Sequence, residues 1–348
     1  MHFVECKLYK AHQIKIMTKK KIKIPPTLFN ETQSLVKLIS QGVDGDFVSY
    51  WISSNSRIVG DDTIPFYEVF KGGKTKNTLY LFIKSDGGSG EASLRLVNLL
   101  RKYYKKIVAL VPLDCASAAT MLVLGADTIK MGPLAYLSAI DTSITHDLSP
   151  VDKDNDLVSV SQNELSRVIN LWNSNKQTGD KNPYSDIYSH IHPLVIGSVD
   201  RATSLSIKLT TDILSYHMLD QKKAEKISTV LNSDYPSHSY PITIKEAKKI
   251  GLKVEELESA LNSNLLKLNG LYSEMAQLAN TDYDEKNYHD NEILKVVEGL
   301  NLKMFYQKDK DWHYRTEERR WVPLNDNSSW RIMSKVGSKI EKSSYYVR

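Results

Sequence analysis

The chain has 348 residues, a formal net charge of +5 at pH 7 and 41% hydrophobic residues. This composition is typical of a globular protein of one large or two ordinary domains, and no apolar run approaches the roughly eighteen residues that a membrane span needs. Two cysteines, Cys6 and Cys115, exclude a disulfide scaffold, and the mild charge does not call for a polyanionic partner. We therefore expect a cytoplasmic protein that makes no membrane contact.

The first part of the chain, residues 1–43, is expected to be an N-terminal extension. It carries a basic cluster and then, from Pro25 to Gln41, apolar residues that favour a short amphipathic helix. Residues 44–71 alternate polar and apolar positions with glycine and Asp-Asp breaks, which predicts a strand pair covering one end of a sheet.

The stretch from Lys76 to Ile144 alternates strand-like and helical apolar runs. The expected elements in chain order are strand 77–84, glycine turn 85–90, helix 91–104, strand 106–112, helix 117–126, and strands 127–131 and 134–140. Strand, helix and strand in this order imply right-handed parallel crossovers. The ends of neighbouring parallel strands lie side by side, so the Gly87-Gly88 turn and Ser117 should meet at one edge of the sheet.

The second half of the chain is predicted to be helical at first and then to change character. The expected helices lie within 161–174, 184–220, 222–231, 244–250 and 255–280. The last of them carries leucines at three- and four-residue spacing, which is typical of a packing or dimer face. Residues 283–348 place Trp312, Trp321 and Trp330 among arginines and polar turns, which favours a small antiparallel β module.

Two separated motifs resemble a known family. The first is the Gly87-Gly88 turn followed by a helix, a strand, Pro112, Ala116-Ser117 and the run at 126–131; the second is the segment 237–252, which contains His-Ser-Tyr-Pro-Ile-Thr. Together they resemble the serine dehydrogenase proteinase family, which is related to signal peptide peptidase and the proteolytic subunit of the Clp protease. The resemblance covers roughly 44–254 and implies an α/β Clp protease/crotonase-like core of stacked ββα units. Outside the resemblance, the leucine spacing favours a helical assembly segment at 255–282, and the β module follows it.

Serine peptidase chemistry needs a nucleophile, a base and oxyanion donors. Ser117 is the candidate nucleophile, because a strand-to-helix turn places a hydroxyl at a positive helix end. The alternative is a serine that fills space among the alanines of a packed helix. The backbone N–H groups of Gly88 and Ala118 are the candidate oxyanion donors, and the resemblance implies the same pair.

The base is the open question in the sequence. Where the Clp subunit has its histidine this chain has Asp141, and Arg201 stands where the family often shows lysine, although arginine cannot act as a base. His238 in the second motif is the first candidate, with Asp141 orienting its ring. His192 and Lys208 are the alternative bases, the lysine only if burial lowers its pKa.

We expect a serine peptidase that cleaves unfolded or flexible peptide segments without a cofactor or metal, since no zinc or Walker spacing appears. The resemblance also implies a homo-oligomer. Two alternatives stay open: an inactive interaction scaffold with a Clp-type core, and a crotonase-type acyl-CoA enzyme. Residues 283–348 are expected to dock a partner protein, because acidic residues interleaved with the arginines argue against nucleic acid.

Overall fold

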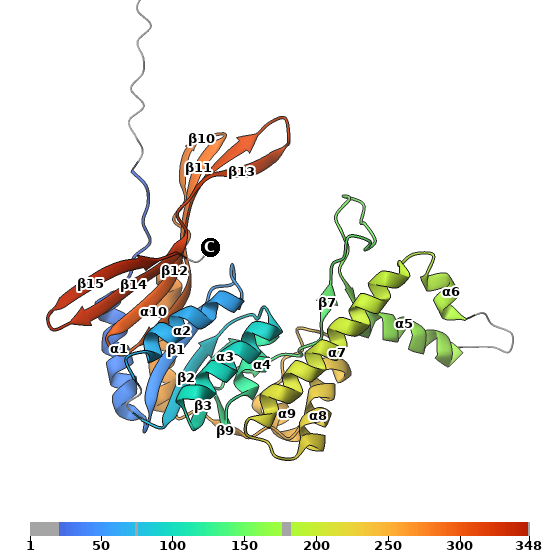
Figure 1. Cartoon of the computed structure of the whole chain (residues 1–348), viewed down its shortest axis with the longest axis horizontal. Helices are drawn as coiled ribbons and strands as arrows, with labels where there is room; N and C mark the ends of the chain where they lie inside the picture. Colours follow the sequence, from blue (N-terminus) through green and yellow to red (C-terminus); the bar gives the residue numbers. More distant parts are fainter. Residues whose placement is uncertain (1–20, 74–75, 176–181, 347–348) are drawn as a thin grey trace, which may run out of the picture.

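The computed structural model describes residues 21–73, 76–175 and 182–346. The first twenty residues of the predicted N-terminal extension, Cys6 included, lie outside these ranges, as do positions 176–181 of a predicted loop. Within the described ranges the fold is mixed α/β, with an 11-stranded sheet at its centre (Figure 1).

The middle of the sheet is parallel, and neighbouring strands follow the chain order. Helices cover the crossovers between them, as the alternating sequence pattern indicates. The parallel strands, in their order across the sheet, are β1 (Asp46–Ile52), β2 (Thr78–Lys84), β3 (Lys106–Val111), β5 (Thr128–Met131) and β9 (Val254–Glu256).

The C-terminal strands extend this same sheet. Strand β11 (Asn287–Gly299) pairs antiparallel with β1, from Val48 opposite Gly299 to Ile52 opposite Lys295. The segment that we expected as a small appended module therefore contributes strands to the central sheet. The remaining antiparallel strands are β10 (Thr281–Asp284), β12 (Leu302–Arg315), β13 (Arg320–Asp326), β14 (Ser329–Val336) and β15 (Lys339–Tyr345).

Helices pack on both faces of the sheet because the buried strands alternate their side chains between two apolar layers. In β2, Leu81 packs with α3 (Gly90–Tyr103) and α4 (Ala118–Leu124), whereas the adjacent Phe82 packs with α1 (Phe29–Gly42) and α10 (Ser259–Met275). The further helices are α2 (Thr63–Phe70), α5 (Gln162–Asn175), α6 (Pro183–Ile187), α7 (Pro193–Ser215), α8 (Gln221–Thr229) and α9 (Ile244–Lys249).

Two local predictions differ from the structure. Residues 63–70 form helix α2 and not the second strand of a pair, because Phe66 and Phe70 are four residues apart and both buried, with ring centroids 6.0 Å apart. Only Tyr136–Leu137 of the strand expected at 134–140 is paired, as β6. The buried members of the leucine stripe of α10 pack against α1 and the sheet within one chain, which is the first of the two roles that their spacing predicts.

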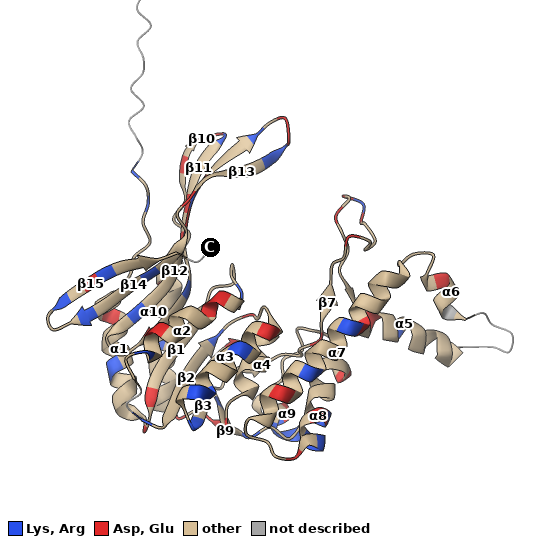
Figure 2. Cartoon of the chain, viewed as in Figure 1, with Lys and Arg blue, Asp and Glu red and all other residues tan. Residues whose placement is uncertain are grey.

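Two parts of the molecule project from the sheet. Figure 1 shows α5, α6 and one end of α7 extending away from it, and β10, β13 and the adjoining parts of β11 and β12 rising as a separate arm. The arm carries both acidic and basic residues (Figure 2), and some of them form ion pairs, as in Arg315–Glu318 and Lys310–Asp326. None of the helices within the described ranges combines the length and apolar character that crossing a bilayer requires.

Candidate active site

The glycine turn and Ser117 lie at the same edge of the sheet. The chain beyond β2 and the short strand β4 (Asp114–Cys115) beyond β3 form a parallel bridge between Ser85 and Cys115. The Ala116 N–H donates to the Ser85 carbonyl oxygen at 2.9 Å. Gly87 lies so close to Ser117 that a Cβ added to it would be 2.7 Å from the Ser117 Cβ. The parallel order of β2 and β3 thus brings the two junctions together.

Ser117 has a strained backbone immediately before α4. Its φ of 52° and ψ of −121° belong to a region that residues with a side chain rarely adopt, and such strain often accompanies function. The Ser117 N–H donates to the Ser138 hydroxyl at 2.8 Å, and the Ser138 N–H donates to the Thr120 hydroxyl at 3.1 Å. These bonds hold the turn so that the half-buried Ser117 hydroxyl lines a cavity.

Two backbone donors line the same cavity. Gly88 has a φ of 145°, and its two chain neighbours bond to Ile58. The Ile58 N–H donates to the Gly87 carbonyl oxygen at 2.8 Å, and the Ser89 N–H donates to the Ile58 carbonyl oxygen at 3.0 Å. The Gly88 N–H points away from this pairing, since a parallel bridge uses only the flanking groups of one partner. Neither the Gly88 N–H nor the Ala118 N–H, at the start of α4, has a hydrogen-bond partner among the described residues. Unpartnered amides beside a serine are what an oxyanion requires.

His238 and Asp141 form a pair across the cavity from α4. The His238 Nδ1 lies 2.7 Å from Asp141 Oδ1, and the histidine side chain is 51% exposed. The hydrogen bond to Asp141 raises the pKa of His238 above its usual value, against the opposing effect of partial burial. A carboxylate on Nδ1 leaves Nε2 as the nitrogen available to a substrate or nucleophile.

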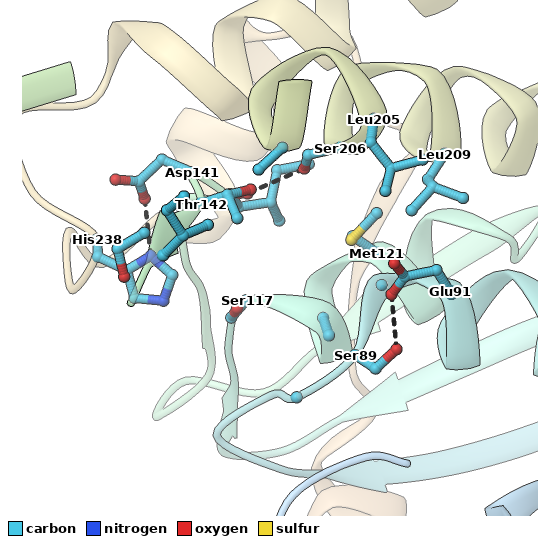
Figure 3. A pocket seen from close by; sticks show the side chains of 17 residues that line it. Ser89, Glu91, Ser117, Met121, Asp141, Thr142, Leu205, Ser206, Leu209 and His238 are labelled. Atoms are coloured by element: carbon cyan, nitrogen blue, oxygen red, sulfur yellow. Dashed lines mark hydrogen bonds and ion pairs between the residues drawn. The ribbon is translucent and has the colours of Figure 1, made fainter. Parts of the chain in front are cut away.

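The cavity has a volume of about 440 Å³ and one apolar wall. Met121 from α4 and Leu205 and Leu209 from α7 form this wall, as Figure 3 shows. Ser117, Gly88, Ala118, Asp141 and His238 all line the cavity. No hydrogen bond joins His238 to Ser117 in the described part of the chain, and the one dashed line that reaches His238 in Figure 3 comes from Asp141.

The other candidate bases lie elsewhere. His192 caps the N-terminus of α7, where its Nδ1 accepts from the Leu194 N–H at 3.2 Å. Lys208 is exposed on α7 and pairs with Asp212 at 2.7 Å. Neither lines the cavity that contains Ser117, and Arg201 does not line it either.

Sequence reasoning missed two residues that support the site. Ser138 fixes the Ser117 turn, and Asn163 of α5 donates to Asp141 Oδ2 at 3.2 Å. Neither stands in a recognisable motif, because each contact joins segments that are far apart in the chain. Within the ranges the structure describes, no group of three or more His, Cys, Asp or Glu side chains is arranged to hold a metal ion.

The sequence identity to the known proteins described below is low. No family model matches the chain. An uncharacterised protein of Methanocaldococcus jannaschii is 22% identical over 175 residues, which cover 50% of this chain and 52% of that protein. The chain thus spans about half the length of the curated relative it matches.

Two solved structures of the 1510-N membrane-bound stomatin-specific protease also align with the fold. A serine-to-alanine mutant is 14% identical, covers 60% of this chain and 79% of its own, and has a TM-score of 0.35. A lysine-to-alanine mutant in complex with a substrate peptide is 14% identical, covers 65% of this chain and 80% of its own, and has a TM-score of 0.36. Because these likenesses are weak, we infer the function from the site itself.

Proposed function

We propose that the protein is a serine peptidase of the Clp-fold type, with Ser117 as its nucleophile. One observation carries the proposal: a serine in a strained turn shares a cavity with two unpartnered backbone N–H groups, those of Gly88 and Ala118. A serine that only filled space among the alanines of α4 would need neither the positive φ nor the neighbouring glycine turn. The substrate class is a peptide in an extended or flexible segment, which the sequence resemblance also implies.

The proposed reaction begins when the Ser117 Oγ attacks the substrate carbonyl carbon. His238 takes the hydroxyl proton through Nε2, while Asp141 holds the ring and stabilises its protonated form. The carbonyl oxygen gains negative charge, which the Gly88 and Ala118 N–H groups stabilise. The tetrahedral intermediate collapses, the amine leaves with the proton from His238, and water then hydrolyses the acyl-enzyme by the reverse set of proton transfers.

The proposed mechanism requires His238 and Ser117 to move closer together. The His238 ring is half exposed, and no hydrogen bond joins it to Ser117 among the described residues, so the two must approach one another when substrate fills the cavity. Catalytic hydrogen bonds are often long in a free enzyme and tighten only with substrate bound. Ile140 and Thr142, the chain neighbours of Asp141, also line the cavity and would contact such a substrate.

The test combines peptide hydrolysis with labelling by a fluorophosphonate, which reacts with activated serines. The wild-type protein should cleave an unstructured fluorogenic peptide library and be labelled, and Ser117→Ala should lose both. Ser143→Ala is the matched control, because Ser143 is another serine that lines the cavity and should retain both. Equal labelling of wild type and Ser117→Ala would rule out Ser117 as the nucleophile.

A second candidate is an inactive scaffold that binds peptides in the same cavity. The separation of His238 from Ser117 favours it, because a serine without a base is a poor nucleophile. This candidate predicts that wild type and Ser117→Ala bind an unfolded peptide equally and that neither is labelled.

A further inference from the structure

Both oxygens of Asp141 have hydrogen-bond partners. Oδ1 lies 2.7 Å from His238 Nδ1, and Oδ2 accepts from the Asn163 side-chain Nδ2 at 3.2 Å. The same Nδ2 donates to the Asn232 carbonyl oxygen at 3.1 Å. The amide of Asn163 therefore joins the first turn of α5 to Asp141 and to η2 (Val230–Asp234), a helical turn that follows α8.

The two acceptors fix the orientation of this amide. Turning it over would place Oδ1 of Asn163 against a carboxylate and a carbonyl oxygen, and both contacts would be repulsive. The start of α5 is itself fixed by reciprocal bonds, since the Ser161 N–H donates to the Glu164 carboxylate and the Glu164 N–H to the Ser161 hydroxyl, each at 3.2 Å. Asn163 thus presents its N–H groups from a rigid support.

Burial does not hold His238 in place. Its side chain is 51% exposed, whereas that of Asp141 is 15% exposed. The ring orientation therefore depends on the direction of the Asp141 carboxylate, which is fixed more firmly when both of its oxygens are bonded than when only one is.

We propose that Asn163 is a positioning residue that fixes the Asp141 carboxylate and, through it, the His238 ring. Its effect on peptide cleavage rests on the proposed function, but its effect on His238 does not. The charged groups on the two cavities that flank His238 are Glu91 from α3 and Glu164 and Arg167 from α5, and Tyr235 is the other titratable group there. Of these, none bonds to the ring within the described ranges, so Asp141 is the group through which Asn163 acts.

The experiment measures the His238 titration by NMR in the full chain, with the signal assigned by its loss in His238→Ala. In Asn163→Ala the pKa of His238 should fall part of the way toward its value in Asp141→Asn. In Asn163→Asp the pKa should instead rise above that of wild type, because a second carboxylate faces the pair. Gln162→Ala, at the adjacent position of α5, should leave it unchanged.

If the pKa of His238 shifts in opposite directions in the two Asn163 variants, Asn163 acts by positioning. A general loosening of α5 would instead shift this pKa in the same direction in both variants. If Asn163→Ala does not fold, the direction of the shift in Asn163→Asp decides. A His238 titration identical to wild type in both variants, or shifted the same way in both, would overturn the proposal.

Peptide cleavage gives a second readout. Asn163→Ala should lower kcat about tenfold with little change in KM, similar to the loss of an outer hydrogen-bond partner at a metal ligand. If His238 shifts as predicted while neither wild type nor any variant cleaves peptides, Asn163 is a positioning residue and the peptidase function is wrong. If wild type cleaves peptides and the pKa of His238 is the same in wild type and in both Asn163 variants, the peptidase function stands and Asn163 is not a positioning residue.

Discussion

Replacing Gly88 by alanine tests the oxyanion site through its backbone. The φ of Gly88 is 145°, and an added Cβ would lie 2.3 Å from the Ile58 carbonyl oxygen and 2.5 Å from the Ile58 nitrogen. Ile58 cannot yield easily, because its side chain is fully buried at 0% exposure. The turn itself must therefore move away from Ile58.

The expected cost follows from these contacts. Moving the turn weakens the bonds between Ile58 and the neighbours of Gly88, at 2.8 and 3.0 Å, which contribute about 1 kcal/mol each. The unfavourable φ adds about 1–3 kcal/mol. We expect the free energy of unfolding to fall by about 3–5 kcal/mol in sum. Displacing one oxyanion donor should also lower kcat by about 10²–10³-fold.

The assay compares urea unfolding and peptide cleavage for Gly88→Ala and Gly197→Ala. A Cβ at Gly197, within α7, meets nothing within 4 Å, so that variant should keep its activity and gain up to about 1 kcal/mol of stability. A folded Gly88→Ala protein that cleaves peptides within about threefold of wild type would refute the role of this N–H.

Two further predictions concern titratable pairs. The hydrogen bond with Asp141 raises the pKa of His238. In a pH–rate profile, kcat/KM should therefore rise with pH as the ring loses its proton, with a midpoint above that of an ordinary histidine. Asp141→Asn should lower this midpoint. The contribution of the same pair to stability should be present at low pH, disappear as the pH rises through the raised pKa, and be small because His238 is half exposed. In the core, Lys295 Nζ lies 2.7 and 2.9 Å from the two oxygens of buried Asp62. Lys295→Met should therefore lower the free energy of unfolding, measured in urea, by about 3–5 kcal/mol, because it leaves the buried Asp62 carboxylate unpaired. Adding Asp62→Asn to this variant should recover part of the loss. If wild type and Lys295→Met were equally stable, the pair would not be desolvated.

The parallel core was predictable because its signals are local. The strand at 78–84, the glycine turn and the small-residue helix each carry their own pattern, and the rule for parallel crossovers then places Gly88 beside Ser117. The role of these residues in catalysis stays a prediction. Helix α2 was missed because alternating residues around Gly60 and the Asp-Asp pair obscured the four-residue spacing of Phe66 and Phe70.

The C-terminal strands could not be placed from the sequence. Their turns and aromatic residues indicate antiparallel strands, but nothing local shows that β11 pairs with β1, more than 200 positions earlier. Polar residues make this pairing still harder to predict, because Glu298 and Lys303 are both fully buried. Glu298 accepts hydrogen bonds from the hydroxyls of Thr32 on α1 and Tyr272 on α10, and the Lys303 Nζ lies 3.7 Å from the Glu298 carboxylate. Likewise, Asn163 meets Asp141 only because α5 returns toward η2.

The most direct test is a crystal structure of the protein after reaction with a small phosphonate, which mimics the tetrahedral intermediate. We predict a covalent bond from the Ser117 Oγ to phosphorus, with one phosphonyl oxygen within hydrogen-bond distance of both the Gly88 and the Ala118 nitrogens and His238 turned toward Ser117. An adduct whose oxygens contact neither amide, or a crystal in which Ser117 stays unmodified while another residue reacts, would contradict the account.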